Sequence, residues 1–308
     1  MKNGINVTQM QKDRINTRVK IIFNQLCLIF LSVVLSGMLN GCSEQSAKTV
    51  EYSIMSFNIR VSTPQDTLDK SWLKRKDAVA EFINQSQTDV VCLQEVNADQ
   101  AMNLMGYFSK SEKYEVKYYP RDASSEGLVM LYDKTVFELE SDGKFWLSTT
   151  PEEQSKSWGS QYIRICTNML LRHKESGERL NVFNVHLDIS QSAPPQQIKV
   201  VLDKVKESPY PAVVTGDLNC FFGSNCYNII SAEMQDCQQT ALETDSGCTY
   251  NGWGTVADNA ATPVDYCFAS KENVKPLVFE ICRDRWNEGS YLSDHYPIRT
   301  EIEVTYEK

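Results

Sequence analysis

Residues 211–220 read PAVVTGDLNC, a stretch that predicts a buried strand with polar side chains at its end. Its first five residues are apolar or β-branched, which is typical of strands in the core of a sheet. Gly216 is expected to break the strand, and Asp217 and Asn219 follow it two positions apart. In an extended chain such residues point to the same face. The stretch therefore predicts a carboxylate and a carboxamide lying side by side.

Polar side chains also mark the ends of other strand-like segments. A single strand-end Asp or His more often turns the chain or caps a helix than performs chemistry. Counting the opening stretch, six segments share this feature, and α/β proteins build their sites in loops at strand ends. The residues outside that stretch are Asn58, Glu95, His186, Asp265, Asp294 and His295. We therefore expect one polar site that several strands share.

The rest of the pattern predicts a single mixed α/β domain over residues 50–308. Strand-like segments outnumber helical ones, no internal repeat is visible, and no linker divides these residues. Helical spacing is found at residues 71–87, 99–107, 194–206 and 224–233. In the first of these, WLKRKD (72–77) is expected to form the solvent-facing side of the helix.

The ordered motifs resemble a known family of phosphoesterases. They are MSFNIR (55–60), LQEV (93–96), NVHLD (184–188), GDLN (216–219), VDYCFAS (264–270) and SDHYPI (293–298). Together they resemble the endonuclease/exonuclease/phosphatase family over about residues 50–306. The resemblance implies a four-layer α/β/β/α sandwich of two mixed β-sheets. It also implies hydrolysis of phosphoester bonds with Mg²⁺ as the cofactor, or Mn²⁺ in its place.

The resemblance implies a metal site at the ends of the strands. Glu95 would bind the Mg²⁺ ion, because a hard cation prefers carboxylate oxygen. Asn58 would join it directly or through water. Asp294 would complete the metal site or orient the base.

It also implies the groups that act on the substrate. Asp217 would activate the attacking water, and Asn219 would donate a hydrogen bond to the same water or to the phosphate. His295, held by Asp265, would stabilise charge on the phosphoryl oxygens. His186 would bind the phosphate or donate a proton to the leaving oxygen. Removing one such preorganised donor typically lowers the rate by about 10²–10³.

Other residues near these motifs are expected to touch the substrate or its neighbours. Arg121 and Arg164 are candidate substrate-binding residues, with Glu126 beside them. SAPPQQ (192–197) stands where many members of the family have an Ala-Arg pair. Any contact made by that arginine is therefore expected to be missing.

The first 41 residues are predicted to be a bacterial lipoprotein signal peptide. Basic residues precede a ten-residue apolar core, Leu26 to Leu35, which is shorter than the roughly twenty residues that span a bilayer. LNGC (39–42) resembles a lipobox, so Cys42 would be lipidated and residues 42–49 would form a polar tether. The protein would then be exported and anchored to a membrane of the cell envelope. A plain amphipathic or transmembrane N-terminus is the alternative.

Charge and cysteine content bear on the partners. Residues 1–41 hold five of the 31 Lys and Arg residues and one of the 40 Asp and Glu residues, so their removal takes the formal charge from −9 to −13. This balance disfavours tight binding to a nucleic-acid backbone. Disulfides are possible in an exported protein, but sequence leaves the pairing of Cys220, Cys226, Cys237 and Cys248 open.

These observations favour a monomeric phosphodiesterase or phosphatase that acts on a small phosphorylated metabolite or a lipid head group. A secreted metal-dependent nuclease and a toxin-like sphingomyelinase are alternatives within the enzymes. A non-catalytic binding lipoprotein on the same scaffold is the alternative of another class, because fold alone does not establish activity.

Overall fold

The computed structural model describes residues 48–123, 126–261 and 263–306. The expected signal peptide, the lipidation site Cys42 and the tether up to residue 47 lie outside these residues. Within the described part, no helix combines the length and the apolar character that a membrane crossing requires.

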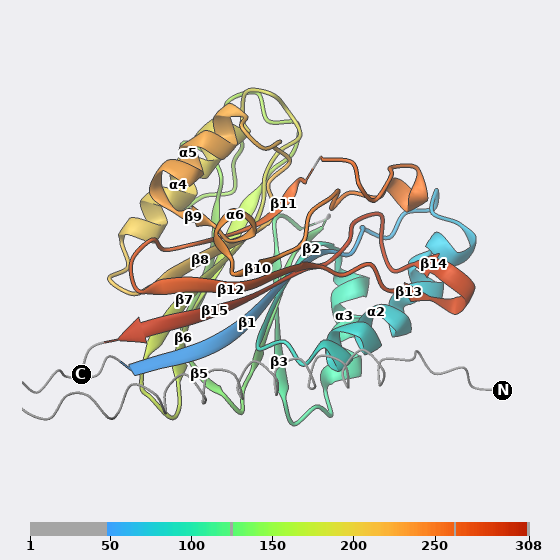
Figure 1. Cartoon of the computed structure of the whole chain (residues 1–308). Coiled ribbons are helices and arrows are strands. Elements are labelled where there is room, and N and C mark those ends of the chain that lie inside the picture. The colour runs from blue at the N-terminus through green and yellow to red at the C-terminus, as the bar shows by residue number, and fades with distance from the viewer. Residues whose placement is uncertain (1–47, 124–125, 262, 307–308) are drawn as a thin grey trace, which may run out of the picture. The chain divides into compact units, whose positions relative to one another are not determined.

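Two β-sheets pack face to face in the described chain (Figure 1). The seven-stranded sheet has the order β10 (Glu243–Thr244), β12 (Val274–Ile281), β15 (Ile298–Tyr306), β1 (Lys48–Asn58), β2 (Val90–Val96), β4 (Gly127–Asp133), β3 (Tyr114–Pro120). The six-stranded sheet has the order β5 (Phe137–Trp146), β6 (Ile165–His173), β7 (Arg179–His186), β8 (Ala212–Asp217), β11 (Asp265–Ala269), β9 (Gln235–Asp236). A separate ribbon pairs β13 (Arg285–Trp286) with β14 (Ser290–Tyr291).

Helices cover the outer faces of both sheets. They are α2 (Trp72–Ser86), α3 (Ala98–Phe108), α4 (Pro194–Lys206) and α5 (Asn225–Glu233). The short α6 (Cys237–Thr240) instead contacts β11 and β12 and buries Cys237 in the core between the sheets. The helices α2 and α3 pack on the seven-stranded sheet, whereas α4 and α5 pack on the six-stranded sheet (Figure 1). Three turns of 3₁₀-helix complete the fold: η1 (Leu68–Lys70), η2 (Gly252–Gly254) and η3 (Asn287–Gly289). The architecture confirms the expected α/β/β/α sandwich.

The period of the strands explains the layers. In β1, Tyr52 and Ile54 face the core between the sheets, whereas Met55 and Phe57 face α2 and α3. Successive side chains of a strand point to opposite faces, so a strand that is apolar on both sides is covered on both sides. The inner strands are therefore buried between a second sheet and a helix layer.

The strand order brings the polar strand ends together. β1 runs parallel to β2, and β7 runs parallel to β8, so their carboxyl ends share one end of the sandwich. β15 is antiparallel to β1, and β11 is antiparallel to β8, so the starts of β15 and β11 lie at that same end. The topology thus gathers the side chains that the motifs singled out.

Two local expectations were wrong. Gly216 does not break the strand, because β8 continues through it to Asp217. A Cβ atom there would lie 1.9 Å from the carbonyl oxygen of Val185, so glycine allows β7 and β8 to approach. The segment 72–77 is not wholly solvent-facing either, since Trp72 and Arg75 are buried.

Candidate active site

Three neighbouring strands place acidic and imidazole side chains next to one another. Asp217, the last residue of β8, pairs with His186 at the end of β7 and with Asp265 at the start of β11. The other sheet contributes Asn58 at the end of β1. Its Nδ2 donates to Asp217 Oδ2 over 3.0 Å, which joins the two sheets at the site.

Glu95 is aimed into this cluster by an irregularity in β2. The pairing with β4 shifts between Leu93 and Val96, and Glu95 has a φ of 57°. A bulge of this kind re-aims a side chain, and a left-handed non-glycine residue is strained backbone of the sort found at functional sites. Asn58 Nδ2 donates to Glu95 Oε1 over 3.1 Å, and the Val61 amide donates to Glu95 Oε2 over 3.0 Å.

These contacts keep Glu95 ionised. Burial alone raises its pKa, but the hydrogen bonds from Val61 and Asn58 and the charge of His295 outweigh burial, so the pKa lies below its ordinary value. Glu95 is therefore a carboxylate at neutral pH.

Asp217 is surrounded by nitrogen atoms. Besides Asn58, His186 Nε2 lies 3.5 Å and His295 Nε2 lies 3.8 Å from its Oδ2 atom. Burial and the nearby Asp265 carboxylate raise the pKa of Asp217 to about 7, against the opposing charge of His295. A base works best when its pKa is near the operating pH, and Asp217 meets that condition.

Asn219 does not share a strand face with Asp217, contrary to the prediction. The strand has ended, and Asn219 has a φ of 47°, which leaves the extended conformation. Its backbone amide donates to Asp217 Oδ1 over 3.0 Å, and its Nδ2 donates to the Leu187 carbonyl over 3.0 Å. Asn219 therefore orients the carboxylate of Asp217 through its backbone.

His295 and Asp265 form a buried pair. His295 Nδ1 donates to Asp265 Oδ2 over 2.9 Å. Burial lowers the pKa of His295, but the carboxylates of Asp265, Asp217 and Asp294 outweigh it and raise the pKa to about 10. The imidazole is thus cationic at neutral pH. The ring of Tyr250 packs edge to face against it, with centroids 5.1 Å apart.

His186 is neutral, and its hydrogen bond fixes the tautomer. Arg164 Nη1 lies 2.9 Å from His186 Nδ1, and a guanidinium can only donate, so Nδ1 is the acceptor and the proton is on Nε2. Burial and the charges of Arg164 and His295 hold the pKa of His186 well below its ordinary value. His186 therefore points an N–H group at Asp217.

The two arginines expected at the substrate lie behind His186. Arg164 is buried, and its Nη1 also donates to Glu126 Oε1 over 3.1 Å. Arg121 Nη1 donates to the same oxygen over 2.6 Å. Both guanidinium groups also lie over the ring of Tyr162, which is partly exposed. Arg164 is thus placed to hold the imidazole.

Asp294 lies at the edge of the cluster beside Arg60, a residue that sequence reasoning did not single out. Arg60 Nη1 is 3.8 Å from Asp294 Oδ2, and its amide donates to Asn58 Oδ1 over 3.0 Å. Burial and the nearby Glu95 carboxylate raise the pKa of Asp294. The position of Arg60 directly after the NI pair of MSFNIR was the available signal.

The residues can hold a divalent cation, and Glu95 is among those that can do so. Glu95, His186 and Asp217 each place a ligand-type atom within 4.8 Å of the others. The His186 nitrogen carries a proton, so only the carboxylates can be ligands. Asn58 directs its nitrogen at both carboxylates while its oxygen accepts from Arg60. Asn58 therefore holds the two acidic groups through its side-chain nitrogen.

The charges of the cluster favour such a cation. The carboxylates repel one another: Asp265 raises the pKa of Asp217, and Glu95 raises the pKa of Asp294. Buried charge is stable only when it is paired or bound to metal. Carboxylate oxygens suit hard cations such as Mg²⁺ and Mn²⁺, so the donor chemistry fits the expected cofactor.

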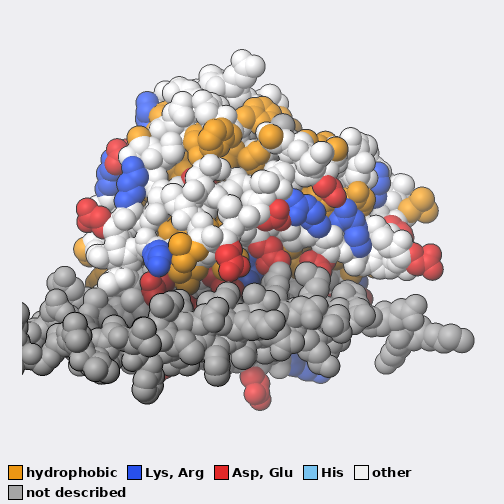
Figure 2. All heavy atoms as spheres, in the orientation of Figure 1, with side chains coloured by type: hydrophobic (Ala, Val, Ile, Leu, Met, Phe, Trp, Pro, Cys, Tyr) orange, Lys and Arg blue, Asp and Glu red, His pale blue; other side chains and the backbone are white. Residues whose placement is uncertain are grey.

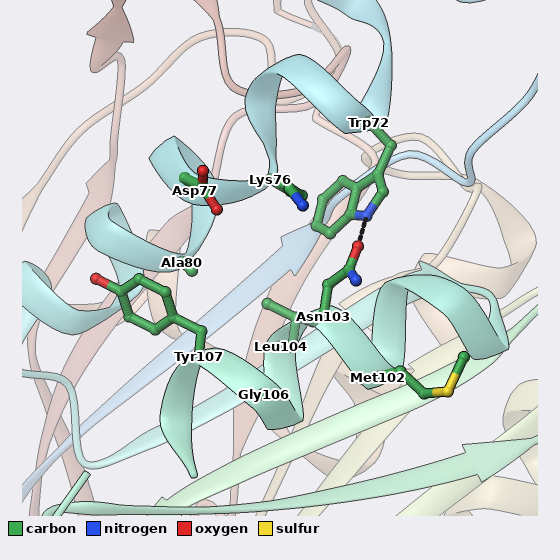
Figure 3. Close-up of a pocket in the computed structure, with 9 residues that line it drawn as sticks. All are labelled: Trp72, Lys76, Asp77, Ala80, Met102, Asn103, Leu104, Gly106 and Tyr107. Atoms are coloured by element: carbon green, nitrogen blue, oxygen red, sulfur yellow. Dashed lines mark hydrogen bonds between the residues drawn. The ribbon is translucent and has the colours of Figure 1, made fainter. Parts of the chain in front are cut away.

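Two other features lie apart from the cluster. A hollow of about 260 Å³ opens between α2 and α3, where Trp72 Nε1 donates to Asn103 Oδ1 over 2.9 Å (Figure 3). None of its lining residues belongs to the cluster. The eight cysteines of the described residues are buried: Cys92, Cys166, Cys220, Cys226, Cys237, Cys248, Cys267 and Cys282. Cys220, Cys226, Cys237 and Cys248, whose pairing the sequence left open, are free.

Comparisons with known proteins agree with this fold. Residues 55–295 match the family described as the Endonuclease/Exonuclease/phosphatase family. An endonuclease/exonuclease/phosphatase from Bacteroides vulgatus has a TM-score of 0.76 and 28% identity, covering 83% of this chain and 99% of that chain. The mannosyl-6-phosphatase of Bacteroides thetaiotaomicron has a TM-score of 0.74 and 23% identity, covering 82% of this chain and 99% of that chain.

The curated relatives are longer proteins. The CCR4-Not complex 3'-5'-exoribonuclease subunit of Candida glabrata is 21% identical over 287 residues, covering 74% of this chain and 33% of that protein. The chain spans between 33% and 59% of the length of the curated relatives that it matches.

The chain belongs to the endonuclease/exonuclease/phosphatase family. Members of this family are metal-dependent hydrolases of phosphoester bonds. The acidic and imidazole side chains gathered in the cluster favour an enzyme over a non-catalytic binding lipoprotein.

Proposed function

We propose that the protein is an exported, lipid-anchored, Mg²⁺-dependent phosphoesterase, active as a monomer. Its substrate is a small phosphorylated metabolite or a lipid head group, and the P–O bond is broken by in-line attack of water. The observation that supports this most strongly is the convergence of His186 and His295 on Asp217. A carboxylate oxygen of Glu95 also lies within 4.8 Å of a carboxylate oxygen of Asp217.

The three side chains divide the work of hydrolysis. Asp217 takes a proton from the attacking water, for which a pKa of about 7 suits it. His295, cationic and held by Asp265, stabilises negative charge on the phosphoryl oxygens. His186 donates its Nε2–H as a hydrogen bond to the leaving oxygen.

The tautomer of His186 limits its role. Because its pKa is held well below the ordinary value, it acts as a neutral donor and not as a cationic acid.

Glu95 and the neighbouring carboxylates would hold the Mg²⁺ ion. The ion, when bound, supplies Lewis-acid neutralisation of charge on the phosphate.

The anchor and the location rest on the N-terminal sequence. LNGC (39–42) supports lipidation of Cys42, and a short apolar core after basic residues supports export to the cell envelope. Incorporation of radiolabelled fatty acid into the full chain, with Cys42→Ser as the control, tests this part. Equal labelling of both proteins would contradict it.

A nuclease is the second candidate, because the Candida glabrata relative is named as an exoribonuclease and a zebrafish structural neighbour is bound to single-stranded DNA product. The face in Figure 2 weakens that candidate: its Lys and Arg side chains lie among Asp and Glu side chains and form no basic stripe on the described surface in view. Nucleic-acid binding normally gains from several neutralised phosphates.

One panel separates the candidates. The protein is assayed with Mg²⁺ or with a chelator on p-nitrophenyl phosphate, bis-p-nitrophenyl phosphate, sugar phosphates, phospholipid head groups, plasmid DNA and single-stranded RNA. We expect metal-dependent turnover of small phosphoesters that exceeds turnover of nucleic acid. Salt-sensitive cleavage of DNA or RNA as the main activity would replace the proposal with the nuclease.

A further inference from the structure

Arg75, on α2, is a fully buried cation beside loops that carry the acidic cluster, by which we mean Glu95, Asp217, Asp265 and Asp294. Its exposed fraction is 0%. Its three side-chain nitrogens donate to four backbone carbonyls. Nε donates to Lys70 over 2.9 Å, Nη2 to Arg60 over 2.8 Å, and Nη1 to both Ile59 and Leu292, the latter over 3.1 Å.

These carbonyls belong to segments that are far apart in the sequence. Ile59 and Arg60 directly follow Asn58, the residue that holds Glu95 and Asp217. Leu292 lies two residues before Asp294. A single guanidinium thus fastens the loop after β1 to the loop before β15.

Aromatic rings hold the guanidinium in place. The rings of Trp72 and Trp253 lie 5.2 Å and 5.5 Å from the Arg75 Cζ atom. The loop that carries Trp253 also holds Asp294, because the amides of Asn251 and Gly252 donate to its carbonyl over 2.8 Å and 3.0 Å. Burial lowers the pKa of Arg75 to about 10, so the side chain remains cationic at neutral pH.

A buried cation that donates to backbone carbonyls needs an explanation. Burial of a charge is costly unless every donor finds an acceptor, and an apolar residue would suit a helix packed on a sheet equally well. Here three of the four carbonyl partners, those of Ile59, Arg60 and Leu292, lie in segments next to the acidic cluster. The planar fork of arginine can reach three segments at once, which the single ammonium of lysine cannot do.

We propose that Arg75 is a positioning residue for the metal site: it locks the loops after β1 and before β15 in one arrangement and thereby sets the affinity for a divalent cation. The inference rests on the proposed function only in taking the cluster of Glu95, Asp217 and Asp294 as the place where the ion binds. Groups that orient metal ligands from behind typically contribute 10–100-fold to metal affinity.

The test compares metal affinity with stability in the same proteins. Mn²⁺ is used as the probe, and its Kd is measured by electron paramagnetic resonance without substrate. Arg75→Lys keeps the charge and is expected to raise the Kd about tenfold or more. Ile83→Ala is the matched control, because Ile83 is a fully buried residue of the same helix. Its apolar side chain makes none of the hydrogen bonds that join Arg75 to the loops. It should lower Tm while its Kd stays within about twofold of wild type.

The outcomes are distinct. An Arg75→Lys protein that folds and binds Mn²⁺ with the wild-type Kd would overturn the inference, whatever its Tm.

Should the variant not fold, Trp253→Leu removes one of the two rings and leaves the four carbonyls in place. An increase in its Kd of about threefold is expected, and an unchanged Kd would equally overturn the inference. A wild-type protein without phosphoesterase activity would remove the proposed function, whereas these substrate-free affinities would still decide the role of Arg75.

Discussion

His295 donates from Nδ1 to Asp265 over 2.9 Å, which leaves its Nε2 atom 3.8 Å from Asp217. One carboxylate thus orients the ring while another lies in front of it. A histidine between two carboxylates keeps its proton, and its Nε2–H points to the place where a phosphoryl oxygen would meet the base. The pairing of β8 with β11, Asp217 opposite Asp265, fixes this arrangement.

Replacement of the base is the sharpest test of its assigned role. Asp217→Asn keeps the shape and the hydrogen bond from the Asn219 amide but removes the proton acceptor. We expect kcat at saturating Mn²⁺ to fall by about 10³-fold or more with folding nearly unchanged, and the Kd for Mn²⁺ to change far less than kcat does. Steady-state kinetics and Mn²⁺ titration of both proteins provide the measurement. Retention of more than a few per cent of the activity would show that another group is the base.

Glu95→Gln should behave differently. It removes a charged metal ligand and leaves the base in place, so the loss is in metal affinity. We expect low activity at about 1 mM Mg²⁺ and partial recovery as the Mg²⁺ concentration is raised. A variant whose activity is independent of Mg²⁺ concentration would contradict the placement of the ion at Glu95.

Arg164→Met tests the hold on His186. Without the donor at Nδ1 the imidazole can turn or change its tautomer, so we expect kcat to fall by about 10–100-fold with a smaller change in KM. Arg172→Met is the control, because Arg172 lies on the following strand β6 and pairs with the exposed Glu138. A loss of the same size in both variants would mean that Arg164 has no particular role.

The His295 pair predicts how stability depends on pH. The folded pKa is about 10, above the ordinary value of 6.5, so the folded protein keeps a proton that the unfolded chain loses. The resulting stabilisation is complete below about pH 6.5 and is lost as the pH rises through about 10. Thermal unfolding of wild type and His295→Gln should therefore show a steeper decline for wild type between these pH values. Parallel curves would contradict the cationic state of His295.

The strands and their polar ends could be predicted from the sequence because they depend on local pattern. Alternation predicts β1, a continuous apolar and β-branched run predicts β8, and the helix expected at 194–206 is α4. The ordered motifs then placed Glu95, Asp217 and His295 at one end of the sandwich.

The remaining features depend on contacts between segments far apart in the sequence. Arg75 appears in a basic run, WLKRKD, that reads as a solvated helix face, and only the fold shows that carbonyls of distant loops surround it. Asn219 follows the strand by two residues, but its left-handed backbone removes it from the strand face. The tautomer of His186 depends on Arg164, 22 residues earlier. Periodicity contains no information about such contacts.

The central claim is that Glu95, Asp217 and His295 surround one cation and one phosphate. A crystal structure with Mn²⁺ and inorganic phosphate, with the metal located by anomalous scattering, tests it most directly. We predict the anomalous peak at the Glu95 carboxylate and a phosphate oxygen within hydrogen-bond distance of His295 Nε2. A peak away from Glu95, or phosphate bound outside the reach of both His295 and Asp217, would contradict the account.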